Sequence, residues 1–359
     1  MGRHRLPHKY IRPSSKDQLT STGFSLTRAL AFFAVSVMLS CVAVSAPTFA
    51  GANALSKGPT LSQLETDLSL SASVSRAPNL SATVPPLGND VSDGLTLPMK
   101  QPCYSVDQAA LPSDPQTECL WGDKNGKKSI FLFGDSQAAT WLAAMNLIGE
   151  SEGYKVYFLS EASCPPWEPS GVKNFTLTTG LTFDECTKII SREIQFANKV
   201  HPALVVLAGD GNSSGTNQYN LSESSYVQEM TGVISRLKPS KAKIVLLSQV
   251  PQYNVSASNP MTPTECLTVH GSDMIPCLLN PDVVTESPVN EALVASSTSS
   301  QVALINVLPL FCTSERCPLV VWTSNGVYLT HYDQYHMDRF YSAFISHALL
   351  QLFLKKVTF

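Results

Sequence analysis

Ser136 lies at a junction where a serine side chain could act as a nucleophile. It follows the apolar run KSIFLFGD (residues 128–135), which is typical of a buried strand, and a helix-like stretch begins at this serine. Parallel α/β sheets bind ligands beyond the carboxyl ends of their strands, and N–H groups at a helix N-terminus stabilise an oxyanion. Gly134 allows the tight turn that this junction needs. In the competing interpretation Ser136 only caps the helix, which is a common role of serine.

The sequence DQYH (residues 333–336) could supply the base that such a nucleophile needs. A carboxylate three residues before a histidine can accept a hydrogen bond from Nδ1–H, which fixes the tautomer and leaves Nε2 free. A serine hydroxyl is weak at its own pKa, so attack requires a neighbouring base. Two other interpretations stay open: a solvated loop histidine without a catalytic role, and a metal site formed by His331, Asp333 and His336. We expect Asp338 to cap the final helix and thereby to hold this loop.

Five apolar runs alternate with helix-like stretches after Lys127, and this order predicts an α/β fold. The runs are KSIFLFGD (128–135), KVYFLS (155–160), ALVVLAG (203–209), KIVLLSQV (243–250) and VALINVL (302–308). Fully apolar strands separated by helices are typical of a parallel sheet that is buried on both faces. The stretch DRFYSAFISHALLQLFLKK (338–356) is expected to form one C-terminal helix that covers this sheet.

The N-terminal part differs from the rest of the chain in charge. Residues 1–28 carry six basic residues against Asp17 alone, residues 29–50 carry no charge, and the remainder has a net charge of −8. Because nucleic acids require a basic surface, we expect no nucleic-acid partner. A basic n-region (1–28) followed by an apolar segment (29–50) predicts a cleaved signal peptide or a single transmembrane anchor, rather than a buried core helix. Both place the later residues outside the cytoplasm.

Residues 51–100 are rich in Ser, Pro and Leu and are expected to form a partly ordered arm with one short helix at 60–70. Residues 101–359 are expected to form one domain that is large enough for an enzyme.

Eight cysteines lie in this domain, whereas Cys41 lies in the apolar segment. They form four couples that are close in the sequence: Cys103/Cys119, Cys164/Cys186, Cys266/Cys277 and Cys312/Cys317. Eight cysteines allow 105 connectivities, and we predict pairing within each couple because it would staple one loop without crossing the core. The spacings do not match a zinc ribbon, so no metal site is expected.

Taken together, these blocks carry a resemblance. FGDSQAATW and YDQYHMD resemble the first and last blocks of the SGNH/GDSL hydrolase superfamily. With PCYS…ECLWGD, SCPPWEP, TECL…IPCL and FCTSERCP in that order, residues 100–359 are similar to the SGNH domain associated with bacterial acyltransferase-3 cell-surface O-acyltransferases. The resemblance implies a three-layer α/β/α sandwich with a parallel sheet of about five strands. It also implies Ser136 as nucleophile, His336 as base and Asp333 as the acid that orients it.

The chain departs from the family pattern at several positions. Gln137 replaces the usual His after the nucleophile, and Met337-Asp338 replaces the usual Leu-Ser/Thr. The middle blocks of the family supply a backbone N–H and an Asn side chain to the oxyanion hole. The resemblance therefore implies an oxyanion hole formed by Ser136 and Asn212, the latter in the sequence GDGN (209–212), with Ser160 and Ser163 as further candidates.

The resemblance implies an exported serine-dependent acyl-ester hydrolase or O-acyltransferase that needs no cofactor. It would act on a cell-envelope polysaccharide or another acylated glycan through an acyl-Ser136 intermediate, either secreted or tethered to the cytoplasmic membrane. Because the sequence has one apolar segment, a membrane acyltransferase-3 partner would be a separate polypeptide. The alternative is a non-catalytic exported binding or assembly module. It is motivated by GDGN (209–212), which matches the third block of the family poorly. A third interpretation, a secreted lipase, lacks an apolar lid-like segment near the site.

Overall fold

The computed structural model describes ten segments of the chain. They are residues 58–75, 83–84, 103–105, 114–167, 182–209, 222–253, 261–270, 273–281, 293–297 and 302–358. The chain divides into two compact units, 1–49 and 50–359, and every described residue belongs to the second. The apolar segment 29–50 and Asn212 lie outside the described residues. Within the described segments, no helix is long and apolar enough to cross a membrane.

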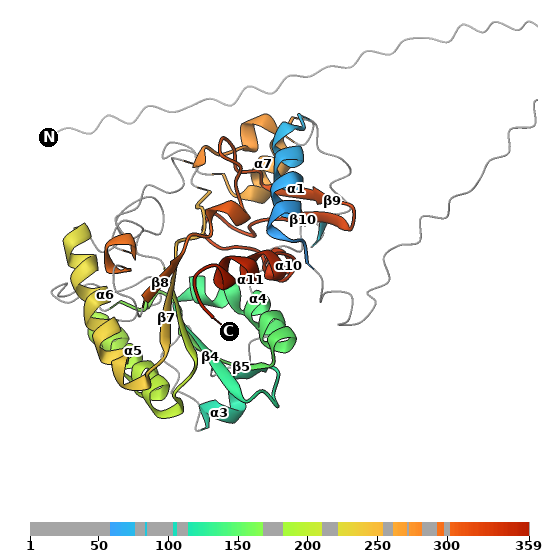
Figure 1. Cartoon of the computed structure of the whole chain (residues 1–359). Helices are drawn as coiled ribbons and strands as arrows, with labels where there is room; N and C mark the ends of the chain where they lie inside the picture. The colour runs from blue at the N-terminus through green and yellow to red at the C-terminus, as the bar shows by residue number, and fades with distance from the viewer. Residues whose placement is uncertain are drawn as a thin grey trace, which may run out of the picture. The chain divides into compact units, whose positions relative to one another are not determined.

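Five parallel strands form the centre of a seven-stranded sheet (Figure 1). They are β4 (Lys128–Gly134), β5 (Tyr154–Glu161), β6 (Leu204–Ala208), β7 (Lys243–Leu247) and β8 (Val302–Ile305), in the order β5-β4-β6-β7-β8. These are the strands expected from the five apolar runs. Two short strands extend the edge: β2 (Tyr104–Ser105) pairs parallel with β5, and β3 (Leu120–Gly122) pairs antiparallel with it. The sheet is therefore mixed, with a parallel centre.

Helices flank the sheet on both faces. Helices α5 (Phe183–Val200) and α6 (Glu223–Leu237) lie on one side, and α4 (Ser136–Glu152), α10 (Arg339–Phe344) and α11 (Ser346–Leu354) lie on the other (Figure 1). The strands between them are almost completely buried, as a sheet covered on both faces requires. The smaller elements are α3 (Pro115–Glu118), α7 (Pro263–His270) and the 3-10 helices η3 (Lys238–Ser240), η4 (Ile275–Cys277) and η5 (Leu308–Leu310).

The single C-terminal helix expected over 338–356 is instead interrupted at Ile345. This residue is fully buried and has ψ 5°, which lies outside the helical range. The interruption is small, since Ile345 N–H still donates to the Tyr341 carbonyl at 3.0 Å and Leu349 N–H donates to the Ile345 carbonyl at 2.9 Å. A β-branched side chain loses rotamer freedom in a helix, which favours a break at this position. Both pieces nevertheless pack against α4.

Helix α1 (Leu61–Ser73) packs against the rest of the second unit. It begins at a capping box formed by Thr60 and Gln63. Leu64 and Leu68 are fully buried, and the Ser71 hydroxyl accepts a hydrogen bond from Trp322 N–H at 2.9 Å. Trp322 belongs to a second small sheet, which is built from β1 (Thr83–Val84), β10 (Gly326–Leu329) and β9 (Val320–Thr323). The short helix expected at 60–70 therefore exists and contributes to the core.

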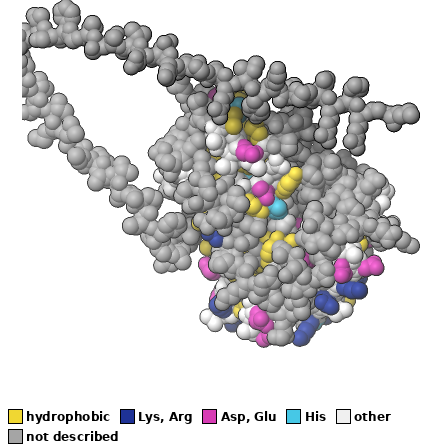
Figure 2. Space-filling model, turned by 180° about the vertical axis from the view of Figure 1, so that it is seen from behind, with side chains coloured by type: hydrophobic (Ala, Val, Ile, Leu, Met, Phe, Trp, Pro, Cys, Tyr) yellow, Lys and Arg dark blue, Asp and Glu magenta, His cyan; other side chains and the backbone are white. Residues whose placement is uncertain are grey.

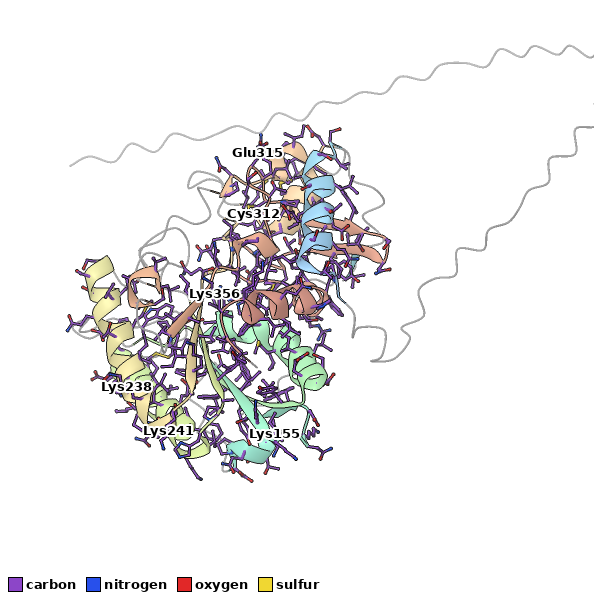
Figure 3. The ribbon with its side chains drawn as sticks, viewed as in Figure 1. Lys155, Lys238, Lys241, Cys312, Glu315 and Lys356 are labelled. Carbon is purple, nitrogen blue, oxygen red and sulfur yellow. A yellow bond between two sulfur atoms is a disulfide. The ribbon has the colours of Figure 1, made fainter. Side chains whose placement is uncertain are left out.

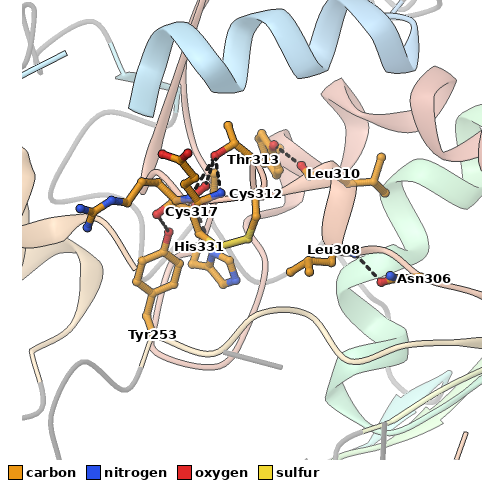
Figure 4. The surroundings of a disulfide bond; sticks show 12 residues. Tyr253, Asn306, Leu308, Leu310, Cys312, Thr313, Cys317 and His331 are labelled. Atoms are coloured by element: carbon orange, nitrogen blue, oxygen red, sulfur yellow. Dashed lines mark hydrogen bonds between the residues drawn. A yellow bond between two sulfur atoms is a disulfide. The ribbon is translucent and has the colours of Figure 1, made fainter. Parts of the chain in front are cut away.

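Four disulfides join the cysteines that were paired by their closeness in sequence. They are Cys103–Cys119, Cys164–Cys186, Cys266–Cys277 and Cys312–Cys317. Each closes a loop of 22 residues or fewer. Figure 4 shows Cys312–Cys317 beside Tyr253 and His331, with the Tyr253 hydroxyl donating to the Cys317 carbonyl at 3.3 Å. This disulfide therefore supports the region from which the DQYH loop emerges.

Candidate active site

Strand β4 delivers Ser136 to the first turn of α4. Gly134 has φ 153°, and a Cβ at this position would collide with the Ala208 carbonyl of the neighbouring strand, so a glycine is required. Asp135 is the N-cap residue: its Oδ1 accepts a hydrogen bond from Gln137 N–H at 2.8 Å. The capping role considered for Ser136 thus belongs to Asp135. The Ser136 side chain is left for another contact.

The loop that carries Asp333 and His336 is closed like a hairpin. An antiparallel bridge joins His331 to Met337, and Tyr332 N–H donates to the His336 carbonyl at 3.2 Å. Asp338 ends the loop and caps α10 as expected: its Oδ1 accepts from the next residues of the helix, at 2.7 Å from Phe340 N. These contacts fix the backbone on both sides of the histidine.

Ser136, His336 and Asp333 form a continuous chain of hydrogen bonds, although the serine and the histidine are 200 residues apart. The Ser136 Oγ lies 2.7 Å from His336 Nε2, and His336 Nδ1 lies 2.7 Å from Asp333 Oδ2. The other oxygen of Asp333, Oδ1, accepts from the N–H groups of Tyr335 and His336, each at 2.7 Å. With the imidazole proton on Nδ1, Nε2 accepts from the serine hydroxyl. The side chain of His336 is 18% exposed, so solvent and substrate can reach the site.

The environment of Asp333 favours its ionised form. Burial by itself would raise the pKa of this carboxyl. The hydrogen bond and the charge of His336, together with the two backbone N–H donors, outweigh burial and hold the pKa of Asp333 below its ordinary value. An ionised Asp333 can therefore keep the Nδ1–H tautomer in place at neutral pH and stabilise an imidazolium.

Comparison with known proteins decides the family. Residues 102–351 match the family model described as "SGNH domain (fused to AT3 domains)". The chain belongs to this SGNH family. The match spans more than half of the chain. No curated protein sequence matches the chain.

Two solved structures resemble the fold of this SGNH domain. One is the periplasmic domain of a lipopolysaccharide acetyltransferase from Salmonella ser. Paratyphi A, with 17% sequence identity, coverage of 71% of this chain and 90% of that chain, and a TM-score of 0.51. The other is a putative acylhydrolase from Bacteroides fragilis, with 14% identity, coverage of 67% and 92%, and a TM-score of 0.38. At 17% identity, the similarity to the acetyltransferase domain shows a shared fold and nothing further.

Two tyrosines that the sequence did not single out border the SGNH site. The Tyr332 ring stacks on His336 with centroids 5.4 Å apart and an interplanar angle of 15°. Tyr104 lies on β2. Burial raises the pKa of its hydroxyl, and the charges of the nearby carboxylates of Asp135, Glu161 and Asp333 raise it further. In the sequence, neither tyrosine has a spacing or neighbour that distinguishes it from a core aromatic residue.

His331 is separated from the Ser136–His336–Asp333 contacts by its burial. It is fully buried, its Nδ1 lies 3.0 Å from Thr330 Oγ1, and its ring packs against Tyr253 and Phe311. Burial lowers the pKa of His331 to about 3, although the charge of Asp333 partly opposes this. No cluster of three or more His, Cys, Asp or Glu side chains suited to a metal ion occurs among the described residues. The structure thus gives His331 a packing role.

The oxyanion-hole candidates differ in what the structure assigns to them. Ser136 N–H lies at the N-terminus of α4, where the helix dipole favours an anion. The Ser160 hydroxyl donates to the Asp135 carbonyl at 2.7 Å, which gives it a structural contact. Ser163 has φ 62° in the turn after β5, a left-handed conformation that is uncommon for serine. Asn212 lies outside the described residues.

Several lysines of the described residues lie at the end of the sheet opposite this site. Most of the dark blue Lys and Arg side chains visible in Figure 2 lie toward its lower end. In Figure 3 the labelled Lys155, Lys238 and Lys241 also lie toward the lower end, whereas Lys356 lies nearer the middle. Lys155 is the second residue of β5, and Lys238 and Lys241 precede β7. These lysines therefore lie at the end of the sheet where the parallel strands begin. Ser136 follows the opposite end of β4.

Proposed function

We propose that this SGNH protein is an exported serine-dependent acyl-ester hydrolase or O-acyltransferase that works through an acyl-Ser136 intermediate. The observation that carries the proposal is the unbroken Ser136–His336–Asp333 chain, with both links at 2.7 Å. This is the arrangement in which a histidine can activate a serine hydroxyl and a carboxylate can hold the histidine. It lies beyond the carboxyl end of a central parallel strand, where α/β sheets bind ligands.

The reaction proceeds in two halves. As Ser136 Oγ attacks the ester carbonyl carbon, His336 Nε2 takes the hydroxyl proton, and the carbonyl π electrons move to the oxygen to form an oxyanion. Collapse of this tetrahedral intermediate breaks the ester C–O bond, and the departing alcohol takes the proton from His336. Water or a sugar hydroxyl then attacks the acyl-Ser136 and loses its proton to Nε2. Collapse of this second tetrahedral intermediate breaks the bond between the acyl carbon and Oγ, and His336 returns the proton to Ser136. Asp333 stays ionised throughout and stabilises the imidazolium.

The oxyanion is stabilised by backbone and side-chain donors. Ser136 N–H is the first donor, and we assign the second to the turn at Ser163 because its left-handed backbone lies directly after β5. The family resemblance assigns a third donor to Asn212, which lies outside the described residues. Loss of one such donor typically raises the barrier by about 3 kcal/mol.

The acyl acceptor is proposed to be a cell-envelope glycan outside the cytoplasm. Four disulfides support an oxidising compartment. The basic and apolar N-terminal sequence supports export by a signal peptide or a membrane anchor. The likeness to a lipopolysaccharide acetyltransferase domain supports a glycan substrate, and the family description "fused to AT3 domains" supports a functional link to a membrane acyltransferase-3 protein. The net charge of −8 after residue 50 does not favour a nucleic-acid partner.

A fluorophosphonate probe tests the proposal, since it reacts covalently with activated serines. We expect wild-type protein to be labelled and Ser136→Ala to remain unlabelled. Ser151→Ala is the matched control, because Ser151 lies at the far end of the same helix and its hydroxyl donates to local groups, the Ile148 carbonyl at 3.1 Å and Glu152 Oε1 at 3.5 Å. Unlabelled wild-type protein would instead favour a non-catalytic binding or assembly module.

A further inference from the structure

Gln137 links the helix of the nucleophile to the loop of the base. Its Nε2 donates a hydrogen bond to the Tyr335 carbonyl at 2.7 Å, across 198 residues of sequence. Tyr335 immediately precedes His336, and Gln137 immediately follows Ser136. Ser136 and His336 contact each other directly. The residue after Ser136 and the residue before His336 form a second contact between the same two segments.

The amide of Gln137 is held in one orientation. The backbone N–H of Gln137 donates to Asp135 Oδ1, which fixes the start of the helix. Since a carbonyl can only accept, the amide group that faces Tyr335 must be the NH₂. On its other side the loop is held by Tyr253 N–H, which donates to the Gln334 carbonyl at 2.7 Å. Two successive carbonyls of the DQYH loop thus accept hydrogen bonds, one from Gln137 on α4 and one from Tyr253 in the segment after β7.

Stability alone does not explain a glutamine at this position. Gln137 is 3% exposed, and its Oε1 is buried without a hydrogen-bond partner among the described residues. An unsatisfied buried oxygen lowers stability, and an apolar side chain of the same length would avoid this cost. The amide therefore carries a penalty that its single 2.7 Å contact must offset.

We propose that Gln137 is a positioning residue that keeps His336 Nε2 within reach of Ser136 Oγ by holding the Tyr335 carbonyl. This inference rests on the proposed function, because the distance that it fixes matters only if His336 takes the proton of Ser136. Gln137 is too deeply buried to touch substrate. Its loss should therefore slow the chemical step and leave substrate binding unchanged.

The test compares Gln137→Met with Gln351→Met in the full-length protein. Methionine has nearly the same length as glutamine and donates no hydrogen bond. Gln351 is the matched control because its Oε1 accepts from Leu61 N–H at 2.7 Å, an equally long-range contact that lies between α1 and α11 and away from the site. Turnover of an acetyl ester, thermal unfolding, and the NMR resonance of the His336 Nδ1–H proton are measured for each.

We expect Gln137→Met to lower kcat about 10- to 100-fold with KM changed less than about twofold. Its Tm should fall no further than that of Gln351→Met, whose kcat should stay at the wild-type value. The Nδ1–H resonance should shift or broaden in Gln137→Met alone. A Gln137→Met enzyme with wild-type kcat and an unchanged resonance would overturn the inference, and so would a kcat loss matched by Gln351→Met.

The same data separate this inference from the proposed function. If the wild-type protein shows no turnover that depends on Ser136, the proposed catalytic role is wrong. The positioning effect is still measured in that case, because the His336 Nδ1–H resonance reports the loop geometry without any substrate. An unchanged resonance in Gln137→Met would then reject the positioning role as well.

Discussion

At the residue scale, local and long-range contacts differ in how far the sequence predicts them. The Asp333–His336 contact is local, and the spacing of three residues suffices to predict it. The approach of Ser136 to His336 was inferred from a family resemblance, because no sequence rule joins positions so far apart. The Gln137–Tyr335 contact was not foreseen: in the sequence, Gln137 is only a departure from the usual histidine.

The buried histidine beside the site makes the protein sensitive to acid. Burial lowers the pKa of His331 to about 3, so the native state binds this proton only in strong acid, whereas an unfolded histidine binds it below about 6.5. The unfolded state thus binds more protons between these values, and stability must fall as the pH falls through this window. The full effect is on the order of 5 kcal/mol.

We expect His331→Phe to remove most of this acid sensitivity. Phenylalanine can keep the ring contacts with Tyr253 and Phe311, but it loses the contact with Thr330 Oγ1, so at pH 7 the variant should be about 1 kcal/mol less stable. Urea unfolding from pH 7 to about pH 4.5 should show a smaller loss of unfolding free energy than in wild type.

Thr330→Val is the matched control for this measurement, because it removes the hydroxyl next to Nδ1 and keeps the buried histidine. Its stability should decrease with acid as steeply as that of the wild type. If His331→Phe and wild type lost stability in parallel between these pH values, the assignment of a neutral buried histidine would be wrong.

At the element scale, length and burial explain which parts could be predicted. The five central strands are mostly apolar because both faces are covered, so their sequences stand out. The edge strands β2 and β3 have two and three residues, too few for any periodicity to show. The break at Ile345 was missed because the apolar pattern continues through it, from Tyr341 to Leu349.

Helix α1 lies far upstream of the strands, yet it is expected to contribute to stability. Leu68 is fully buried on the face that packs against β9, whereas Leu70, two residues later, is 55% exposed. We expect Leu68→Ala to lower the unfolding free energy by about 2 to 5 kcal/mol. Leu70→Ala removes the same atoms from an exposed position and should change it by less than about 0.5 kcal/mol. Equal effects of the two substitutions in chemical unfolding would show that α1 does not pack as described.

At the scale of the whole molecule, the features that position the site come from distant parts of the chain. The parallel strands bring the end of β4 to the sheet edge where ligands bind, and the Cys312–Cys317 disulfide with its aromatic neighbours supports the returning DQYH loop. Pairing of the cysteines could be predicted because each couple is sequence-local. No comparable residue pattern indicates whether water or a sugar hydroxyl accepts the acyl group, so the sequence does not predict this choice.

The central claim is that the acyl group passes through Ser136, and trapping that intermediate tests it most directly. Wild-type protein mixed with p-nitrophenyl acetate and quenched in acid before deacylation should give a peptide that carries one acetyl group on Ser136. His336→Ala, treated in the same way, should give no acetylated Ser136. Steady release of nitrophenol by the wild type with the acetyl group on another residue would contradict the account.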